Sequence, residues 1–487
     1  MNKVYRIALL LLAATSTSVV AKPITSIAEF SKAGGGDQRV LVLLKDPNRQ
    51  RDRVSRLESK GWVNMNQHIA NLQNEAVAEF GWRNLNDVVR LASEPVLSKK
   101  VSTQEMRKLL ASDRVEGIYE DLPMARSLAQ SKVAIAKPRV VTNVGSYTGT
   151  IAVIDDGIDA DHPFFSANEV VDQACFSQDG ECPNDSTMMF GAGAARPCDD
   201  GCDHGTHVAG IAAGGPGNGS PQGLTGVANG AKLLAVNVFP TGGLTSTTDI
   251  LLAMEWVLSK REKNNVQVLN MSLGNNIQRS PGYCDQDNPI YGYVIHKLVG
   301  AGIAVVISSG NDSETQSVSV PACLKNAISV GSLEKNGTVS DFSNTNARLD
   351  IYAPGGDIVS AVNHDQYASL SGTSMAAPHV AGAWLVLSAA FPNATYDEKL
   401  RALKSGAAVT DSRSTSNFKA PSLRLDSAFS QLSAQHGSPK ESQTPDPVST
   451  PKDSASGMNS NQTGEQRVDG ILIRSNSEQK KDKIKWR

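Results

Sequence analysis

One segment, GTSMAAPHVAG from Gly372 to Gly382, constrains the fold of this chain more than any other. It places Ser374 at the start of a stretch of small residues that predicts a tightly packed helix, and Pro378 falls in the first turn, where a missing N–H costs little. Helix N-termini carry unpaired N–H groups and partial positive charge, so a hydroxyl there becomes a nucleophile once a base takes its proton. Taken alone, the segment also fits an ordinary buried helix start.

Two further segments supply the partners that such a serine needs. IAVIDDGID, residues 151–159, is an apolar run that predicts a buried parallel strand with Asp155 at its carboxyl end. DHGTHVAGIAAG, residues 203–214, predicts a turn and a second small-residue helix that begins near His204. A buried carboxylate can orient an imidazole, and the imidazole can then activate a serine. The chain order Asp, His, Ser is that of subtilisin, not of chymotrypsin or the α/β-hydrolases.

With these motifs in order, the chain resembles the subtilisin-like serine proteases, the subtilase family, over roughly residues 131–432. The resemblance implies an α/β fold of three layers with a mostly parallel sheet. It also implies roles for Asp155 as orienting acid, His204 as general base and Ser374 as nucleophile. AVVISSGND, residues 304–312, resembles the family's oxyanion-binding segment, which gives that role to Asn311. A turn-shaping asparagine is the alternative interpretation.

Other segments resemble the walls of the subtilase substrate groove. VLNMSLGNN, residues 268–276, resembles one wall of the primary specificity pocket, and TGGLTS, residues 241–246, resembles the edge that pairs with the substrate main chain. A small residue at the pocket floor implies a preference for Leu, Phe or Met before the cleaved bond. Each match alone also fits a core strand and its loop. The candidate substrate-binding residues are Gly243, Ser272, Leu273, Gly274, Ser308, Ser309, Gly310 and Ser319.

All six cysteines lie between Cys175 and Cys323, inside the segment that resembles a protease. An even number of cysteines in an exported chain predicts disulfides. Short spacing favours Cys175–Cys182 and Cys198–Cys202, which leaves Cys284 to pair with Cys323.

The N-terminus has the pattern of a secretory signal. Lys3 and Arg6 precede an apolar run at residues 7–14 that is too short to span a bilayer, and small residues lead to a predicted cleavage after Ala21. We therefore expect residues 1–21 to be a signal peptide and the protein to be secreted, outside the cell or into a periplasm.

Residues 22–128 contain none of the catalytic motifs. We expect a strand at residues 39–45, a capped helix that begins at Ser102, and a strand over Val115–Ala125. This region resembles the small α+β propeptide that inhibits and helps to fold subtilases. An unrelated N-terminal binding domain is the alternative interpretation.

The segment VEGIYEDLPMARSLAQS, residues 115–131, resembles the junction between a subtilase propeptide and its protease. The resemblance implies cleavage after Leu128, with Leu128 in the primary pocket and Ala125 in the pocket three residues back. Residues 129–432 would then form the catalytic domain.

The rest of the sequence limits partners. Residues 433–487 are rich in Ser, Pro, Lys, Asp and Gln, which predicts a disordered tail. The chain of 487 residues has a net charge of −2, which indicates no nucleic-acid partner, and no later stretch is long and apolar enough for a membrane span. We expect a monomer whose partners are protein and peptide substrates and its own propeptide.

Two departures from the family pattern bear on metal and specificity. Asp156 follows Asp155, as in kexin-like convertases that prefer basic residues before the cleaved bond. Phe164 stands where many subtilases have a calcium-ligating Asp, and the loop at residues 218–228 is rebuilt, so the usual calcium site is not expected. No cofactor is expected for catalysis. Other acidic loop residues could bind calcium or simply be solvated: Asp179, Glu181, Asp185, Asp199 and Asp200.

Two rival functions remain open at this point. One is a binding protein that keeps a protease fold without catalysis, and the intact set of Asp155, His204, Ser374 and Asn311 argues against it. The other is a processing protease with few targets. A peptide-library digest would separate that from a broad scavenger.

Overall fold

The computed structural model describes residues 23–32, 37–47, 59–126, 147–199, 201–215, 221, 223–275 and 279–437, without the side chains of 59–65 and 126. The predicted signal segment 1–21, the junction at Leu128 and residues 438–487 of the predicted tail lie outside this part of the chain. Residues 433–436, predicted as the start of a disordered tail, are instead the last turn of the helix Leu425–His436.

The centre of the fold is a sheet in which the described strands follow the order β17-β16-β14-β11-β6-β9-β7-β8. All neighbours are parallel except β7 and β8, which are antiparallel. Strands such as β6 and β14 are buried along their whole length, as expected for a parallel sheet covered on both faces. The bounds are β6 Thr150–Asp155, β7 Val170–Phe176, β8 Met188–Phe190, β9 Lys232–Asn237, β11 Val266–Met271, β14 Ala304–Ser308, β16 Ile328–Leu333 and β17 Ile351–Pro354.

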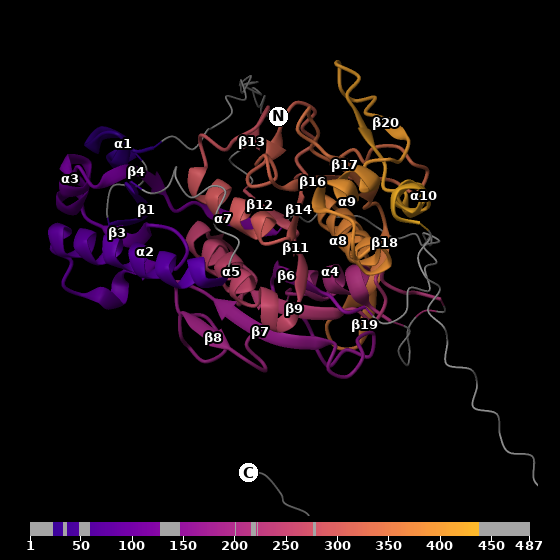
Figure 1. Ribbon diagram of the computed structural model, residues 1–487, viewed down its shortest axis with the longest axis horizontal. Helices are drawn as coiled ribbons and strands as arrows, with labels where there is room; N and C mark the ends of the chain where they lie inside the picture. Colours follow the sequence, from indigo (N-terminus) through magenta and orange to yellow (C-terminus); the bar gives the residue numbers. More distant parts are fainter. Residues whose placement is uncertain are drawn as a thin grey trace, which may run out of the picture. The chain divides into compact units, whose positions relative to one another are not determined.

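Helices cover both faces of this sheet, which gives the three layers that the sequence predicted (Figure 1). α4 (His204–Ala213) and α8 (Thr373–Ala390) share one core with the sheet, and α5 (Thr247–Ser259) and α7 (Pro289–Gly300) share the other. α4 and α8 approach closely because their facing residues are small. A Cβ added at Gly382 would lie 2.9 Å from a backbone oxygen of α4.

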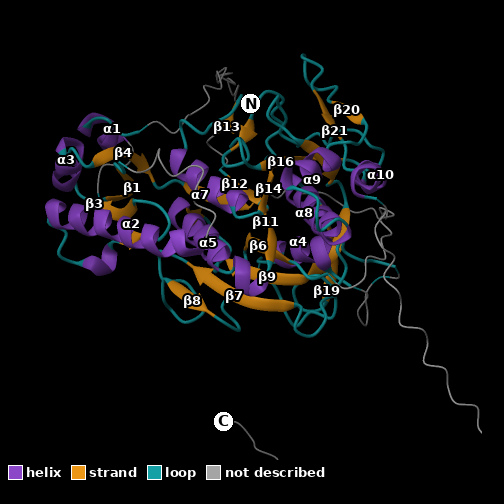
Figure 2. Cartoon of the chain, viewed as in Figure 1, coloured by secondary structure: helices purple, strands orange, loops and turns teal. Residues whose placement is uncertain are grey.

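The N-terminal region forms a separate antiparallel sheet in the order β2-β3-β1-β4, with helices on its outer face (Figures 1 and 2). The predicted helix after Ser102 is present, and a capping box between Ser102 and Glu105 fixes its start. The other face of this sheet joins the core beneath α5 and α7. The bounds are α1 Ile27–Lys32, β1 Gln38–Leu44, α2 Ser59–Phe80, β2 Val89–Arg90, β3 Val96–Val101, α3 Thr103–Ala111 and β4 Val115–Glu120.

The single strand predicted over Val115–Ala125 is wrong in its extent. β4 ends at Glu120, and a new strand, β5 (Pro123–Arg126), begins after two intervening residues and pairs with the protease region instead. The smaller elements are η1 Leu85–Asp87, β10 Thr245–Ser246, α6 Arg261–Asn264, β12 Leu273–Gly274, β13 Arg279–Ser280, β15 Val318–Ser319, β18 Ile358–Val362, β19 Gln366–Leu370, α9 Tyr396–Leu403, β20 Ala408–Thr410, β21 Lys419–Pro421 and α10 Leu425–His436.

The cysteines form the three disulfides that spacing predicted: Cys175–Cys182, Cys198–Cys202 and Cys284–Cys323. The second closes the loop immediately before His204. In the described part of the chain, no helix has the length and apolar character needed to cross a membrane.

Candidate active site

Asp155 and His204 meet at the carboxyl edge of the sheet. Asp155 is the last residue of β6 and His204 is the first of α4, and Nδ1 of His204 lies 2.7 Å from Oδ1 of Asp155. Each is 1% exposed. Because an ionised carboxylate only accepts, Nδ1 carries the proton, which leaves Nε2 of a neutral ring as an acceptor. Nε2 has no hydrogen-bond partner among the described residues. The pair therefore presents an oriented, unoccupied base.

Ser374 lies in the first turn of α8 and is fully buried. Its Oγ donates to the carbonyl of Ser272 at 3.0 Å, and the hydroxyl of Ser272 donates to the carbonyl of Ser374 at 2.8 Å. The hydroxyl of Ser374 is thus directed at the residue before β12, not at His204. Hydrogen bonds between a nucleophile and its base are often made only when substrate is bound.

Asn311 follows the end of β14 and has its side-chain amide fixed in one orientation. Its Oδ1 accepts from the N–H of Thr373 at 2.9 Å and from the Thr373 hydroxyl at 2.8 Å. Its Nδ2 is buried and has no partner among the described residues. Gly310 has φ +105°, and a Cβ there would lie 2.3 Å from Asn344 Nδ2. The backbone turn and Thr373 fix the amide of Asn311 by its oxygen. Nδ2 is therefore left as an unused donor next to the residue that precedes Ser374.

Asp156 has a place in the site that sequence reasoning missed. The residue is fully buried, and its carboxylate accepts from the N–H of Gly205 at 2.6 Å and of His204 at 3.3 Å. A carboxylate at this end of α4 complements the positive helix terminus and fixes the residue that carries the imidazole. In the sequence, this residue resembles that of kexin-like convertases that prefer basic residues. In the structure its oxygens accept from N–H groups at the start of α4, which gives Asp156 a role in holding that helix. The pairing joins residues 48 positions apart, so no local signal pointed to it.

His207, one turn along α4, is a structural histidine. Its Nε2 lies 3.0 Å from the carbonyl oxygen of Ile358 and 3.2 Å from that of Ala368. Complete burial lowers the pKa of His207 to about 3, so the ring is neutral at ordinary pH.

The residues predicted to form the primary pocket come together. Ser308 ends β14, and Ser309 and Gly310 follow it. The N–H of Ser319, in β15, donates to the carbonyl of Ser309 at 2.9 Å, and all four are buried. Asn344 links these segments, because it accepts from the Ser309 hydroxyl through its carbonyl. The structure therefore gathers this part of the predicted set beside Asn311.

A three-stranded sheet lies where the sequence predicted the substrate groove, with β5 held antiparallel between β10 and β12. Ser272 immediately precedes β12, which consists of Leu273 and Gly274. β10 lies within the edge predicted at residues 241–246, but the pairing falls at Thr245–Ser246, and Gly243 lies outside it. The two walls therefore hold an extended segment by its main chain, as in strand addition.

The register of β5 puts Met124, not Ala125, in the pocket that the family resemblance placed three residues back from the primary pocket. We call this pocket the apolar pocket. Met124 is 1% exposed and packs in a core with Leu273 and Ile250, whereas Ala125 is only half-buried. Side chains alternate along a strand, so a register one residue earlier than expected moves the other side chain into the pocket.

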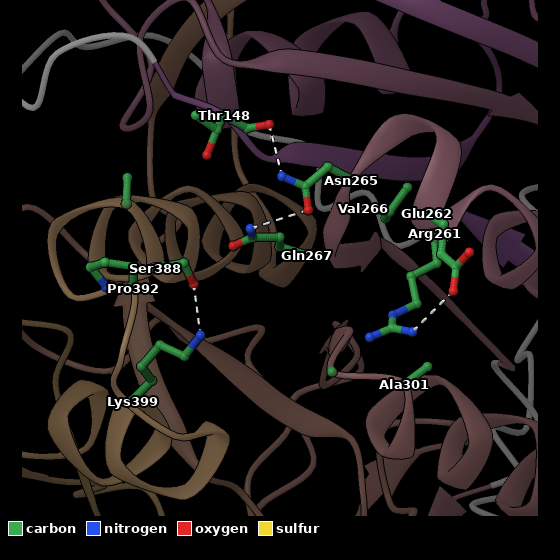
Figure 3. A pocket seen from close by; sticks show the side chains of 12 residues that line it. Thr148, Arg261, Glu262, Asn265, Val266, Gln267, Ala301, Ser388, Pro392 and Lys399 are labelled. Atoms are coloured by element: carbon green, nitrogen blue, oxygen red, sulfur yellow. Dashed lines mark hydrogen bonds and ion pairs between the residues drawn. The ribbon is translucent and has the colours of Figure 1, made fainter. Parts of the chain in front are cut away.

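Two other features are candidates for parts of this site, a metal-binding cluster and a second pocket away from Asp155. Among the described residues, no group of three or more His, Cys, Asp or Glu could hold a metal ion, and Phe164 is buried in apolar surroundings. A pocket of about 470 Å³, where Lys399 donates to Ser388, opens at the other end of the sheet (Figure 3). Its residues include Thr148, just before β6 begins, whereas Asp155 ends that strand.

The structure thus has a buried Asp155–His204 pair at the carboxyl edge of a mostly parallel sheet and Ser374 in the first turn of α8. Residues 148–431 match the model of the subtilase family, and the chain belongs to that family. It is 34% identical to an intracellular serine protease of Paenibacillus polymyxa over 51% of this chain and 69% of the relative. It is 33% identical to subtilisin E of Bacillus subtilis over 51% and 58%, and 35% identical to the halolysin-like extracellular serine protease Nep of Natrialba magadii over 51% and 41%. The protein is a serine endopeptidase.

Proposed function

We propose that Ser374 attacks the peptide carbonyl while His204 takes its proton, with Asp155 orienting the imidazole. The 2.7 Å contact between Asp155 and His204, which orients the imidazole, carries this proposal. Nδ2 of Asn311 and the N–H of Ser374 bind the oxyanion of the tetrahedral intermediate. His204 then protonates the leaving amine, and a water molecule activated by the same ring releases the acyl-enzyme. No cofactor takes part.

We further propose that the region predicted at residues 22–128 is an inhibitory propeptide, with its exact end considered below. The support is that β5 occupies the groove and that the same region contacts α5 and α7. Glu255 of α5 accepts from the N–H groups of Ala92 and Ser93, each at 2.8 Å. On α7, Lys297 pairs with Glu94 at 2.9 Å, and both side chains are more than nine-tenths buried. A segment anchored in this way blocks the groove until it is cut and released.

The register of β5 favours a junction one residue earlier than the resemblance implied. Ala125 lies opposite Gly274 and Arg126 opposite Leu273. A strand that continued this register by one residue would reach Ser272, whose carbonyl accepts from Ser374. We therefore propose cleavage after Ser127 in place of Leu128. N-terminal sequencing of the mature chain distinguishes Leu128 from Ala129 as its first residue.

Release of the propeptide should depend on pH through Asp121. Burial raises the pKa of this carboxyl, against hydrogen bonds from Thr248, and the net value is about 6. Asp249 adds to the rise and the Arg39 guanidinium opposes it. The free carboxyl has a pKa of about 4, lower than in the complex. The propeptide therefore binds most tightly below about pH 4, where the carboxyl is protonated in both states. The affinity should therefore fall as the pH rises from about 4 to 6, and stay low above that.

Asp121→Asn should slow propeptide release at pH 8 by about tenfold or more, because two pKa units correspond to about a hundredfold in affinity. The amide keeps an acceptor for the Thr248 N–H and carries no charge. The measurement is the fraction of cleaved propeptide that stays with the mature chain with time on a sizing column. Asp113→Asn, an exposed position of the same region, serves as the control. Release as fast as in the unaltered chain would contradict the role of Asp121.

Secretion and an apolar primary pocket complete the proposal. The predicted signal at residues 1–21 and the three disulfides support export, since disulfides persist in oxidising compartments. The small side chain of Ser319 supports a pocket for Leu, Phe or Met in substrates, whereas the junction proposed above puts the smaller Ser127 there. We expect the mature protein to act as a monomer on protein and peptide substrates.

A fluorophosphonate probe tests the catalytic proposal directly. After propeptide release, we expect labelling of Ser374 at one probe per chain, because an activated serine attacks the phosphorus centre. Peptide mapping locates the label. An unlabelled mature chain would favour the rival hypothesis of a binding protein on a protease fold.

A further inference from the structure

A small acidic pocket of about 220 Å³ lies beside the groove, next to β10. Asp179 and Glu181, from the loop between β7 and β8, line it together with Asp249 from the first turn of α5. Asp121 and Pro123 of the N-terminal region cover it. No lysine, arginine or histidine is among the described residues that line it. The pocket therefore offers negative charge and oxygen acceptors to whatever enters it.

The loop that carries these carboxylates is held in place. The Cys175–Cys182 disulfide closes it, and Oε2 of Glu181 accepts from the hydroxyl of Thr241 at 2.9 Å. That hydrogen bond ties the loop to the segment leading into β10. The carboxylates are thus fixed to the edge of the groove, not carried on a free loop.

One buried polar atom in the pocket, Oγ1 of Thr245 in a residue 7% exposed, has no hydrogen-bond partner among the described residues. Asp249, which is 4% exposed, receives hydrogen bonds from Gln178. Oδ2 of Asp249 also accepts from the hydroxyl of Ser246 at 2.8 Å. Buried polar groups are nearly always paired, so the Thr245 hydroxyl indicates a missing partner. The N-terminal region does not supply it, because it brings a further carboxyl, that of Asp121, to the pocket.

A cationic group that donates hydrogen bonds suits the Thr245 oxygen and the carboxylates around it. The described carboxylates do not form a metal-binding cluster, so an organic cation fits better than a metal ion. In β5, Pro123 lies opposite Ser246 and lines the acidic pocket, whereas Met124 enters the apolar core. Because side chains alternate along a strand, a long side chain in the place of Pro123 would extend into the acidic pocket.

We propose that Asp179, Glu181 and Asp249 form a subsite for a lysine or arginine side chain of the peptide substrate, at the position opposite Ser246. In the substrate, the basic residue immediately precedes the residue whose side chain takes the place of Met124 in the apolar pocket. The proposal rests on the proposed peptidase activity. It makes the enzyme selective for a basic residue well before the cleaved bond, while the primary pocket still takes an apolar side chain. The propeptide has Pro123 at this position and leaves the subsite unused.

Three fluorogenic peptides test this subsite on the mature enzyme. They are identical except for Lys, norleucine or Glu at the fifth residue before the cleaved bond, the position that the register of β5 assigns. We expect kcat/KM to fall in that order, with at least about a tenfold ratio between Lys and Glu at low salt. The ratio should shrink as salt is added, because the carboxylates of Asp179 and Glu181 are exposed.

The double variant Asp179→Asn/Glu181→Gln should reduce the ratio to about twofold. Asp185→Asn is the matched control, since this exposed carboxylate lies on the same loop but does not line the pocket; it should keep the full ratio. Equal rates for the three peptides would overturn the subsite and leave the peptidase proposal intact. A ratio that survives in the double variant would also overturn it. Failure to cleave any peptide would overturn the proposed function, and the subsite with it.

Discussion

Ser374→Ala is expected to abolish peptide hydrolysis and to leave the purified chain uncut between its N-terminal and protease regions. The methyl side chain cannot form the acyl-enzyme, and in the related subtilisin loss of the nucleophilic serine lowers turnover about 10⁶-fold. The fold should survive, because the change removes one hydrogen bond to the carbonyl of Ser272 and creates only a small void. A stable variant that is uncut and inactive would assign both maturation and catalysis to the same hydroxyl.

Gel mobility and mass of the purified variant give the measurement, and thermal unfolding checks the fold. Ser388→Ala is the control, because Ser388 lies on the same helix at the other end of the sheet, where it accepts from Lys399. It should mature normally. Cleavage of purified Ser374→Ala at the usual rate, with no other protease present, would refute self-processing.

The elements of the three segments proposed to be catalytic could be predicted from the sequence because each carries its own local signal. An apolar run that ends in a carboxylate became β6 ending at Asp155, and small-residue runs became α4 starting at His204 and α8 holding Ser374 in its first turn. Strand ends and helix starts of a parallel sheet meet at one edge, so predicting the elements also predicted their proximity.

What the sequence could not supply depends on partners far along the chain. The break between β4 and β5 arises because β5 pairs with β10 and β12, not with the N-terminal sheet. A slip of one residue in that pairing decides between Met124 and Ala125 in the apolar pocket, and no local pattern fixes such a register. The contact of Asp156 with the start of α4 is likewise visible only once both segments are folded.

Asn311→Asp is expected to lower kcat by at least about 10²-fold while KM changes little. In subtilisin, loss of the oxyanion donor costs about 10²–10³ in turnover. The aspartate keeps an acceptor for the Thr373 N–H and hydroxyl, so the turn is preserved. It replaces the donor Nδ2 with an anionic oxygen where negative charge develops in the transition state.

Comparing this variant with Asn311→Ala separates charge from shape. Alanine removes the donor but adds no negative charge, and it also loses the acceptor for Thr373, so it should be less stable yet more active than the aspartate variant. Steady-state kinetics on one peptide, with thermal unfolding of each variant, measures both. If Asn311→Asp kept kcat within about threefold, Nδ2 of Asn311 would not be an oxyanion donor. Its lack of a partner would then need another explanation, because a buried amide N–H₂ is rarely left unpaired without a role.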